Sequence, residues 1–85
     1  MSRFRVSVNI SPRQGILDPQ GKAVADALHS LDFAEVSDVR IGRFVVMQLD
    51  APDGEAARQR AREMCDRLLA NPVIEDYDIA SVEES

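Results

Sequence analysis

The stretch from Leu17 to Val24 constrains the fold most, because it joins a strand-like segment to a helix-like one. Asp18 is a good helix N-cap, since its carboxylate accepts hydrogen bonds from the free amides of a first helical turn. Pro19 supplies the backbone angle of the first helical position, where no amide donor is needed. Gly21 is unexpected there, because glycine within a helix costs roughly 0.5–1 kcal/mol relative to alanine. We therefore predict a helix that begins at Pro19, with a close neighbour at Gly21.

Apolar periodicity assigns the segments on either side of this joint. From Phe4 to Ile10 apolar and polar residues alternate, which predicts a strand with one buried face. Ser11–Leu17 is predicted to be a loop. From Pro19 to Leu31 the apolar residues follow helical spacing, at Val24, Ala27, Leu28 and Leu31. This pattern predicts a surface helix that packs by one stripe.

Two apolar runs in the segment Val36–Asp50 flank the dipeptide Gly42-Arg43, which predicts a β-hairpin. In the second run, Phe44 and Val46 have the opposite parity to the other apolar residues, so that strand is apolar on both faces. We expect a second copy of the chain or another protein to cover the extra face, with Phe44 and Val46 as the self-association residues. The alternative is that Phe44 ends the hairpin and folds over the sheet edge.

A second helix is predicted after the turn Ala51–Gly54, and Asn71-Pro72 ends it. Its apolar stripe includes Cys65, which we interpret as a small core residue. Val73–Val82 then supplies the last strand.

This element order predicts an α+β fold, a ferredoxin-like βαββαβ sandwich in one domain spanning residues 1–85. Both helices should cover one face of a four-stranded antiparallel sheet, with the first and third strands in the centre.

Composition excludes several classes of function. Fifteen acidic residues against ten basic ones give a net charge of −5, which disfavours nucleic acid and anionic membranes as partners. One His and one Cys leave almost no means of building a nucleophile with its base or a metal site, so we predict neither catalytic residues nor a bound metal. The lone cysteine, and the absence of any apolar run near the ~18 residues that cross a bilayer, favour the cytoplasm.

Four separated stretches resemble the PurS family, the small subunit of phosphoribosylformylglycinamidine (FGAM) synthase. They are Gly15-Ile16-Leu17-Asp18-Pro19-Gln20-Gly21, Ala27-Leu28-His29-Ser30-Leu31, Val39-Arg40-Ile41-Gly42-Arg43, and Met64-Cys65 with Leu68-Leu69-Ala70-Asn71-Pro72-Val73-Ile74-Glu75-Asp76-Tyr77. The resemblance spans nearly the whole chain.

The resemblance implies a non-catalytic assembly and coupling subunit in de novo purine biosynthesis. It would act as a homodimer or tetramer that joins an ATP-dependent synthetase subunit (PurL) to a glutaminase subunit (PurQ), for the conversion of formylglycinamide ribonucleotide, glutamine and ATP to FGAM, glutamate, ADP and phosphate. Mg-ATP or ADP would bind the synthetase, and this chain would bind no cofactor. The alternative is a free-standing dimeric regulatory domain that senses a small ligand.

The most distinctive stretches of the resemblance run from Arg13 to Gly21 and from Asn71 to Asp76. They imply partner-binding residues at Arg13, Asp18, Gln20, Gly21, Asn71 and Glu75. Arg13 departs from the lysine usual in the family, and a guanidinium can make a two-pronged contact that an ammonium cannot. The alternative is that capping by Asp18 and helix termination by Asn71-Pro72 explain these stretches as local structure.

Overall fold

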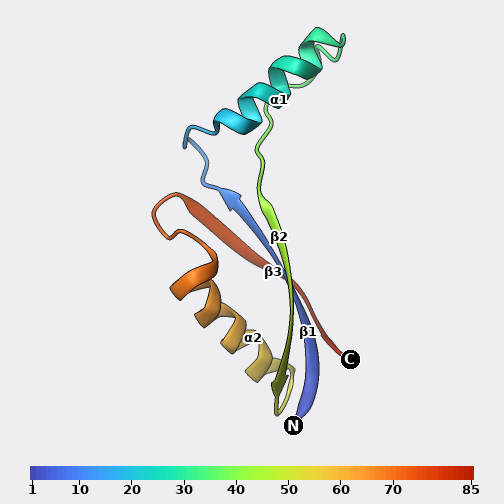
Figure 1. The fold of residues 1–85 in the computed structure, drawn as a ribbon, viewed down its shortest axis with the longest axis vertical. Helices are drawn as coiled ribbons and strands as arrows, with labels where there is room; N and C mark the ends of the chain where they lie inside the picture. The colour runs from blue at the N-terminus through green and yellow to red at the C-terminus, as the bar shows by residue number, and fades with distance from the viewer.

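A computed structural model describes residues 1–85, and its elements follow the chain as a strand, a helix, a strand, a helix and a strand. Their bounds are β1 (Ser2–Pro12), α1 (Pro19–Ser30), β2 (Arg43–Ala51), α2 (Gly54–Met64) with a π-helical turn η1 (Cys65–Leu69), and β3 (Glu75–Glu84). The molecule is elongated, with extents of 52 × 26 × 14 Å, because α1 lies beyond one end of the sheet while α2 packs against it (Figure 1).

The sheet has three antiparallel strands in the order β2-β1-β3. Val6 of the central strand lies opposite Met47 on one side and Val82 on the other. Between Ser7 and Val8 the pairing of β1 with β3 shifts, as at a β-bulge.

One face of the sheet and α2 enclose the core. The alternating residues of β1 that were predicted to be buried are so: Phe4, Val6, Val8 and Ile10. α2 and η1 meet them with the small side chains Ala57, Ala61 and Cys65, none of which is exposed to solvent. Small residues on a helix let its backbone approach the strands closely, so this packing explains why Cys65 is a core residue, as predicted.

The predicted four-stranded sheet is wrong, because residues 36–41 do not form a strand. There is therefore no hairpin at Gly42-Arg43, and β2, predicted to be central, lies at a sheet edge. Instead, the segment around Val39 and Ile41 returns beside α1. The backbone amide of Ile41 donates to the Asp18 side chain and not to a neighbouring strand. The position of β1 in the centre is confirmed.

The prediction that both helices cover one face is also wrong. Only α2 packs on the sheet, whereas α1 and the segment that returns from it form an arm, here defined as residues 18–42 (Figure 1). The start of α1 is nevertheless as predicted, with Asp18 as N-cap and Pro19 in the first turn. At its other end Asp32 takes a left-handed conformation with φ of 72°, and the amide of Phe33 donates to the carbonyl of Leu28. These are features of a Schellman cap, which ends the helix.

Candidate functional site

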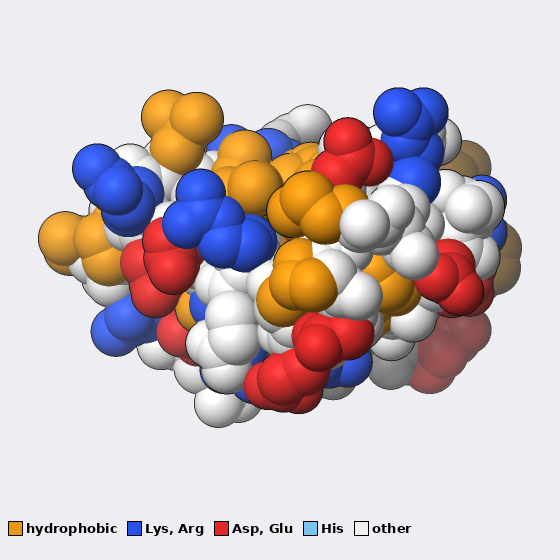
Figure 2. Space-filling view, turned by 90° about the horizontal axis from the view of Figure 1, so that it is seen from below, with side chains coloured by type: hydrophobic (Ala, Val, Ile, Leu, Met, Phe, Trp, Pro, Cys, Tyr) orange, Lys and Arg blue, Asp and Glu red, His pale blue; other side chains and the backbone are white.

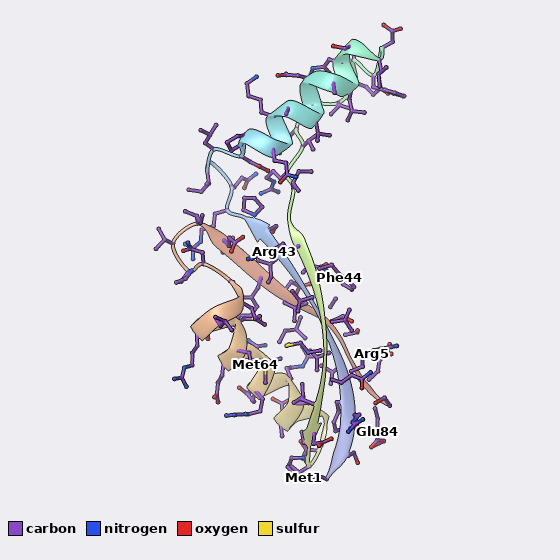
Figure 3. All side chains as sticks on the ribbon, viewed as in Figure 1. Met1, Arg5, Arg43, Phe44, Met64 and Glu84 are labelled. Atoms are coloured by element: carbon purple, nitrogen blue, oxygen red, sulfur yellow. The ribbon has the colours of Figure 1, made fainter.

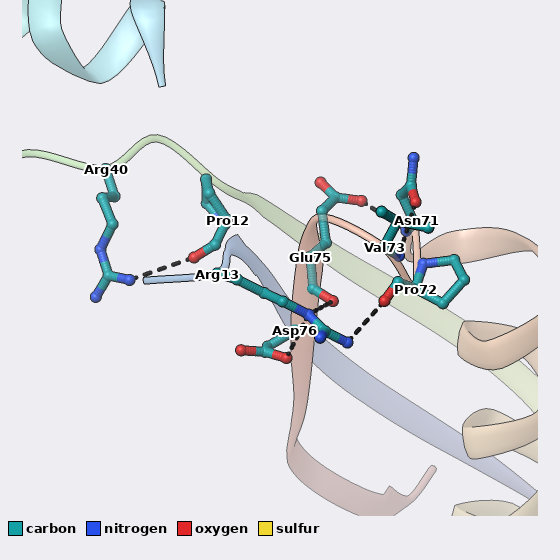
Figure 4. A network of polar contacts seen from close by, with 8 residues as sticks. All are labelled: Pro12, Arg13, Arg40, Asn71, Pro72, Val73, Glu75 and Asp76. Atoms are coloured by element: carbon teal, nitrogen blue, oxygen red, sulfur yellow. Dashed lines mark hydrogen bonds and ion pairs between the residues drawn. The ribbon is translucent and has the colours of Figure 1, made fainter. Parts of the chain in front are cut away.

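Arg13 connects the loop after β1 to the loop before β3 (Figure 4). Its Nη2 donates to the carbonyl of Pro72 at 2.7 Å, and its Nε lies 3.3 Å from a carboxylate oxygen of Asp76. The backbone amide of Arg13 also donates to the carbonyl of Ile74 at 2.8 Å. The contacts of Arg13 therefore connect the two stretches that were predicted to bind partners, Arg13–Gly21 and Asn71–Asp76. We call these two stretches together the loop junction.

Glu75 holds the second loop of the junction in place. Its Oε1 accepts from the backbone amide of Asn71 at 2.8 Å and from Nη2 of Arg43 at 2.6 Å. Arg43 also donates to the carbonyl of Leu69 at 2.9 Å, so it ties η1 to β2 and β3. The Asn71 side chain accepts from the amide of Val73 at 3.0 Å. Glu75 and Asn71 thus have structural partners within the chain, and the Glu75 side chain is only 19% exposed.

Asp18 joins the start of α1 to the segment that returns from the helix. One carboxylate oxygen accepts from the amide of Gly21 at 3.0 Å and the other from the amide of Ile41 at 2.8 Å. The hydrogen bond from Ile41, followed by that from Gly21, lowers the pKa of Asp18 below its ordinary value, because both stabilise the charged form.

Gly21 is buried at the base of the arm, and a Cβ there would overlap the carbonyl oxygen of Val39. The close neighbour predicted for this glycine is therefore the returning backbone. Gln20 is exposed, and its side chain forms no hydrogen bond. The structure thus brings Arg13 together with Asn71 and Glu75, while it places Asp18 and Gly21 at the base of α1.

Arg40 and Arg43, which the sequence did not indicate as site residues, link these parts. Arg40 Nη1, near the end of the arm, donates at 3.2 Å to the carbonyl of Pro12, the last residue of β1 (Figure 4). The residues joined by these arginines are 26 to 32 positions apart in the sequence. Local periodicity carries no signal for such contacts.

The sheet face opposite α2 has no covering element. Phe44 and Val46 lie on this face and are 63% and 52% exposed, and Figure 3 shows Phe44 on the side of β2 away from α2. In register beside them on β1 are Asn9 and Ser7. Further along the same face, the side chain of Arg5 pairs with Glu83 at 2.6 Å. An apolar patch therefore lies within a polar surface, which is typical of a face that another protein covers.

Other large apolar side chains reach the surface at the loop junction and on η1. Leu17 is 78% exposed, Val73 75% and Leu68 83%. Seen along the long axis from the end away from α1, apolar side chains lie exposed among charged ones (Figure 2). Surface of this kind suits contacts with other polypeptides.

The pKa values of two weakly acidic side chains, Cys65 and Tyr77, are raised above their ordinary values. Burial raises the pKa of the Cys65 thiol, and the nearby Asp66 carboxylate raises it further. Burial is also the main cause of the raised pKa of Tyr77, and a hydrogen bond with Asp66 adds to it. Both groups are therefore protonated at neutral pH. No group of three or more His, Cys, Asp or Glu side chains is arranged to hold a metal ion, and no helix is long and apolar enough to cross a membrane.

Comparison with known proteins finds similarity along nearly the whole chain. Residues 5–83 match the family described as PurS: phosphoribosylformylglycinamidine (FGAM) synthase. The phosphoribosylformylglycinamidine synthase subunit PurS of Bacillus subtilis is 46% identical over 74 residues, which is 87% of each chain.

Two solved structures are similar in fold. Thermus thermophilus PurS matches with a TM-score of 0.86 and 36% identity, covering 98% of both chains. A chain in the structure of PurLQS from Thermotoga maritima matches with a TM-score of 0.84 and 27% identity over the full length of both chains.

Proposed function

The chain belongs to the PurS family of phosphoribosylformylglycinamidine synthase, and from this we propose that it is the non-catalytic subunit that assembles and couples the enzyme. Its partners would be the synthetase PurL and the glutaminase PurQ. The observation that carries this proposal is the full-length similarity to a chain of the Thermotoga maritima PurLQS structure. Glutamine would be hydrolysed on PurQ, and the ammonia would be used on PurL to convert formylglycinamide ribonucleotide to FGAM.

Within this assembly, Mg-ATP and ADP would belong to the synthetase subunit. The raised pKa values of Cys65 and Tyr77 disfavour the thiolate and the phenolate, which supports a role without a nucleophile in this chain. We also propose a cytoplasmic location, which fits a free buried thiol in a reducing compartment.

The loop junction is the surface that we propose contacts the larger subunits, with Arg13, Asn71 and Glu75 on one part and Asp18, Gln20 and Gly21 on the other. The rigidity of these loops supports the proposal. Most of the six residues form hydrogen bonds within the chain, and these bonds hold the loops that carry the exposed side chains of Leu17 and Val73. Fixed loops bind with a smaller entropic cost than mobile ones. In this arrangement the polar residues position the surface, and the apolar side chains supply contact area.

Self-association is proposed to use the open sheet face around Phe44 and Val46, giving a homodimer or a tetramer. The exposure of both side chains on a sheet face without a covering helix supports this assignment. A chain of 85 residues also buries only a modest core by itself, so added interface area would stabilise it.

Co-purification tests the assembly. We would mix the tagged chain with the two larger subunits, with and without glutamine and Mg-ADP, and analyse the products by size-exclusion chromatography. We expect a complex that contains all three proteins in at least one condition. If the chain elutes alone under every condition, the proposal is wrong.

A further inference from the structure

The positive charges of this chain are unevenly neutralised. Seven of its ten lysine and arginine side chains form ion pairs within the chain: Arg3, Arg5, Arg13, Lys22, Arg40, Arg43 and Arg60. The other three, Arg58, Arg62 and Arg67, form neither an ion pair nor a side-chain hydrogen bond, and all of them lie on α2 and η1. This helix therefore carries every unpaired lysine or arginine charge of an acidic protein.

Two of these arginines lie on the same side of α2. Arg58, which is half-buried, and Arg62, which is exposed, are four residues apart, so they follow each other at about 6 Å along the helix. Burial and the Asp66 carboxylate raise the pKa of Tyr77 on β3, and the positive charge of Arg62 opposes this rise. Arg62 therefore lies on the side of α2 that is turned toward β3. We call this side, with Arg58 and Arg62, the arginine face.

Carboxylates of the same helix do not neutralise the arginine face. Glu55 accepts a hydrogen bond from the side-chain amide of Gln59 at 3.1 Å, and Glu63 pairs with Arg60 at 2.9 Å. Like charges four residues apart on a helix repel each other, which destabilises the helix slightly. An anion supplied by another molecule would remove this repulsion.

The surroundings of the arginine face indicate the kind of anion. No hollow of the molecule has Arg58 or Arg62 in its lining, and the hollow beside Tyr77 is lined by three carboxylates, those of Asp66, Glu75 and Asp76. A small free anion would therefore find no enclosed site and a repulsive neighbourhood.

A carboxylate that belongs to a folded partner needs no enclosed site, because the rest of the interface holds it in place. The guanidinium group matches a carboxylate with two parallel hydrogen bonds. The net charge of −5 disfavours the phosphates of nucleic acids and of anionic membranes as the source. The chemistry that fits the arginine face is thus an acidic segment of a protein.

We propose that the arginine face docks an acidic segment of one of the two larger subunits, with Arg58 and Arg62 each bound to a carboxylate of that segment. This inference rests on the proposed function and adds a second contact surface to the loop junction. α2 leads through η1 into the loop 71–76 of the junction (Figure 1), so one partner can contact both surfaces. The loop junction supplies fixed apolar contacts, whereas the arginine face supplies charge, which speeds and orients the encounter.

Removing both charges tests this surface. Arg58→Gln combined with Arg62→Gln keeps polar side chains that favour a helix, and circular dichroism verifies that the variant is folded. Binding to each larger subunit, separately and together, would be measured by biolayer interferometry at low and at high ionic strength. We expect about tenfold weaker binding or more to one larger subunit at low ionic strength. The difference from the wild-type chain should shrink at high ionic strength, because salt screens exposed charges.

Arg60→Gln with Arg67→Gln is the matched control. It removes the same charge from the other side of the same helix, where both arginines line a hollow together with Met47 of β2. It should bind the larger subunits like the wild-type chain. An equal loss in this control would assign the effect to net charge and would contradict a role of the arginine face.

Two other results would overturn the proposal. One is wild-type binding by the Arg58 and Arg62 double variant. The other is a changed mass of that variant in sedimentation, which would make the arginine face a contact between copies of this chain. If the wild-type chain itself binds neither larger subunit, the proposed function is wrong and this inference falls with it, so the two failures give different results.

Discussion

Asp18 and Ile41 are joined by a hydrogen bond of 2.8 Å across 23 positions of sequence, from the backbone amide of Ile41 to a carboxylate oxygen of Asp18. The other carboxylate oxygen caps α1 at Gly21. One charged side chain therefore starts the helix and fixes the segment that returns from it. This carboxylate therefore holds the two ends of the arm together.

Acid should loosen the base of the arm. The pKa of Asp18 in the folded chain lies below its ordinary value of 3.8, so its stabilising contribution is fully present above pH 3.8 and is lost as the pH falls through the folded pKa. We expect the NMR signals of the Ile41 and Gly21 amides to titrate with a midpoint below 3.8. Asp18→Asn should abolish this titration, and an unchanged profile in that variant would contradict the assignment.

Gly21→Ala should displace the returning segment. The added Cβ would overlap the carbonyl of Val39 and lie 2.6 Å from a carboxylate oxygen of Asp18, so the backbone must move. We expect faster amide hydrogen exchange at Ile41. The matched control is Gly54→Ala, where the nearest atom would lie at an ordinary 3.8 Å and the first turn of α2 should keep its protection. Equal exchange in the two variants would count against a special role of Gly21.

Arg13→Lys should weaken the loop junction while keeping the charge. Lysine cannot reach Pro72 and Asp76 with two prongs, as the guanidinium does. Because these contacts are exposed, we expect a modest loss of about 0.5–1.5 kcal/mol, seen as faster exchange at the loop 71–76 and as binding to the larger subunits that is a few-fold weaker.

Arg3→Lys is the control for this change, since Arg3 makes only a 3.6 Å ion pair with Asp50 between side chains that are both 62% exposed. It should leave the loop and the binding unaffected. Wild-type binding by Arg13→Lys would show that the junction does not position the partner surface.

Phe44→Ser with Val46→Ser should shift the protein toward a smaller assembly. Burying a fully exposed side chain of this size contributes about 1.5–3 kcal/mol, and only about half of each is still exposed in the single chain. For the two together we therefore expect the dissociation constant to rise about tenfold or more. Sedimentation velocity over a dilution series measures this shift. Gln48→Ser, on the same face of β2 but polar, is the control, and an unchanged mass in the double variant would exclude this face as the interface.

The local structure of this chain could be predicted from its sequence wherever one residue pattern decides it. Asp18-Pro19 set the start of α1, and the alternation from Phe4 to Ile10 set the buried face of β1. The strand predicted around Val39 and Ile41 was wrong, because the alternation of apolar and polar residues does not show which acceptor a backbone amide will bond to. Here the amide of Ile41 donates to the side chain of Asp18, 23 positions away, and not to a neighbouring strand.

The candidate site was predictable only in part. Family resemblance selected Arg13 and Asn71, but their contacts depend on loops about 60 residues apart that meet through Arg13. Arg40 and Arg43 stand in one of the stretches that carry the resemblance, but nothing in the sequence indicated their contacts, which are with carbonyl and carboxylate oxygens far along the chain. The direction of α1 was not predictable either, since its apolar stripe would fit its own sheet or another molecule equally well.

The coupling function is tested most directly by the source of nitrogen that the reconstituted enzyme can use. FGAM formation would be measured with the synthetase and glutaminase subunits, with glutamine or with free ammonia as the nitrogen donor, before and after addition of this chain. We predict that the chain increases the glutamine-dependent rate strongly and changes the ammonia-dependent rate little, because it joins the two subunits and does no chemistry itself. A glutamine-dependent rate that is equally high without the chain would contradict the account.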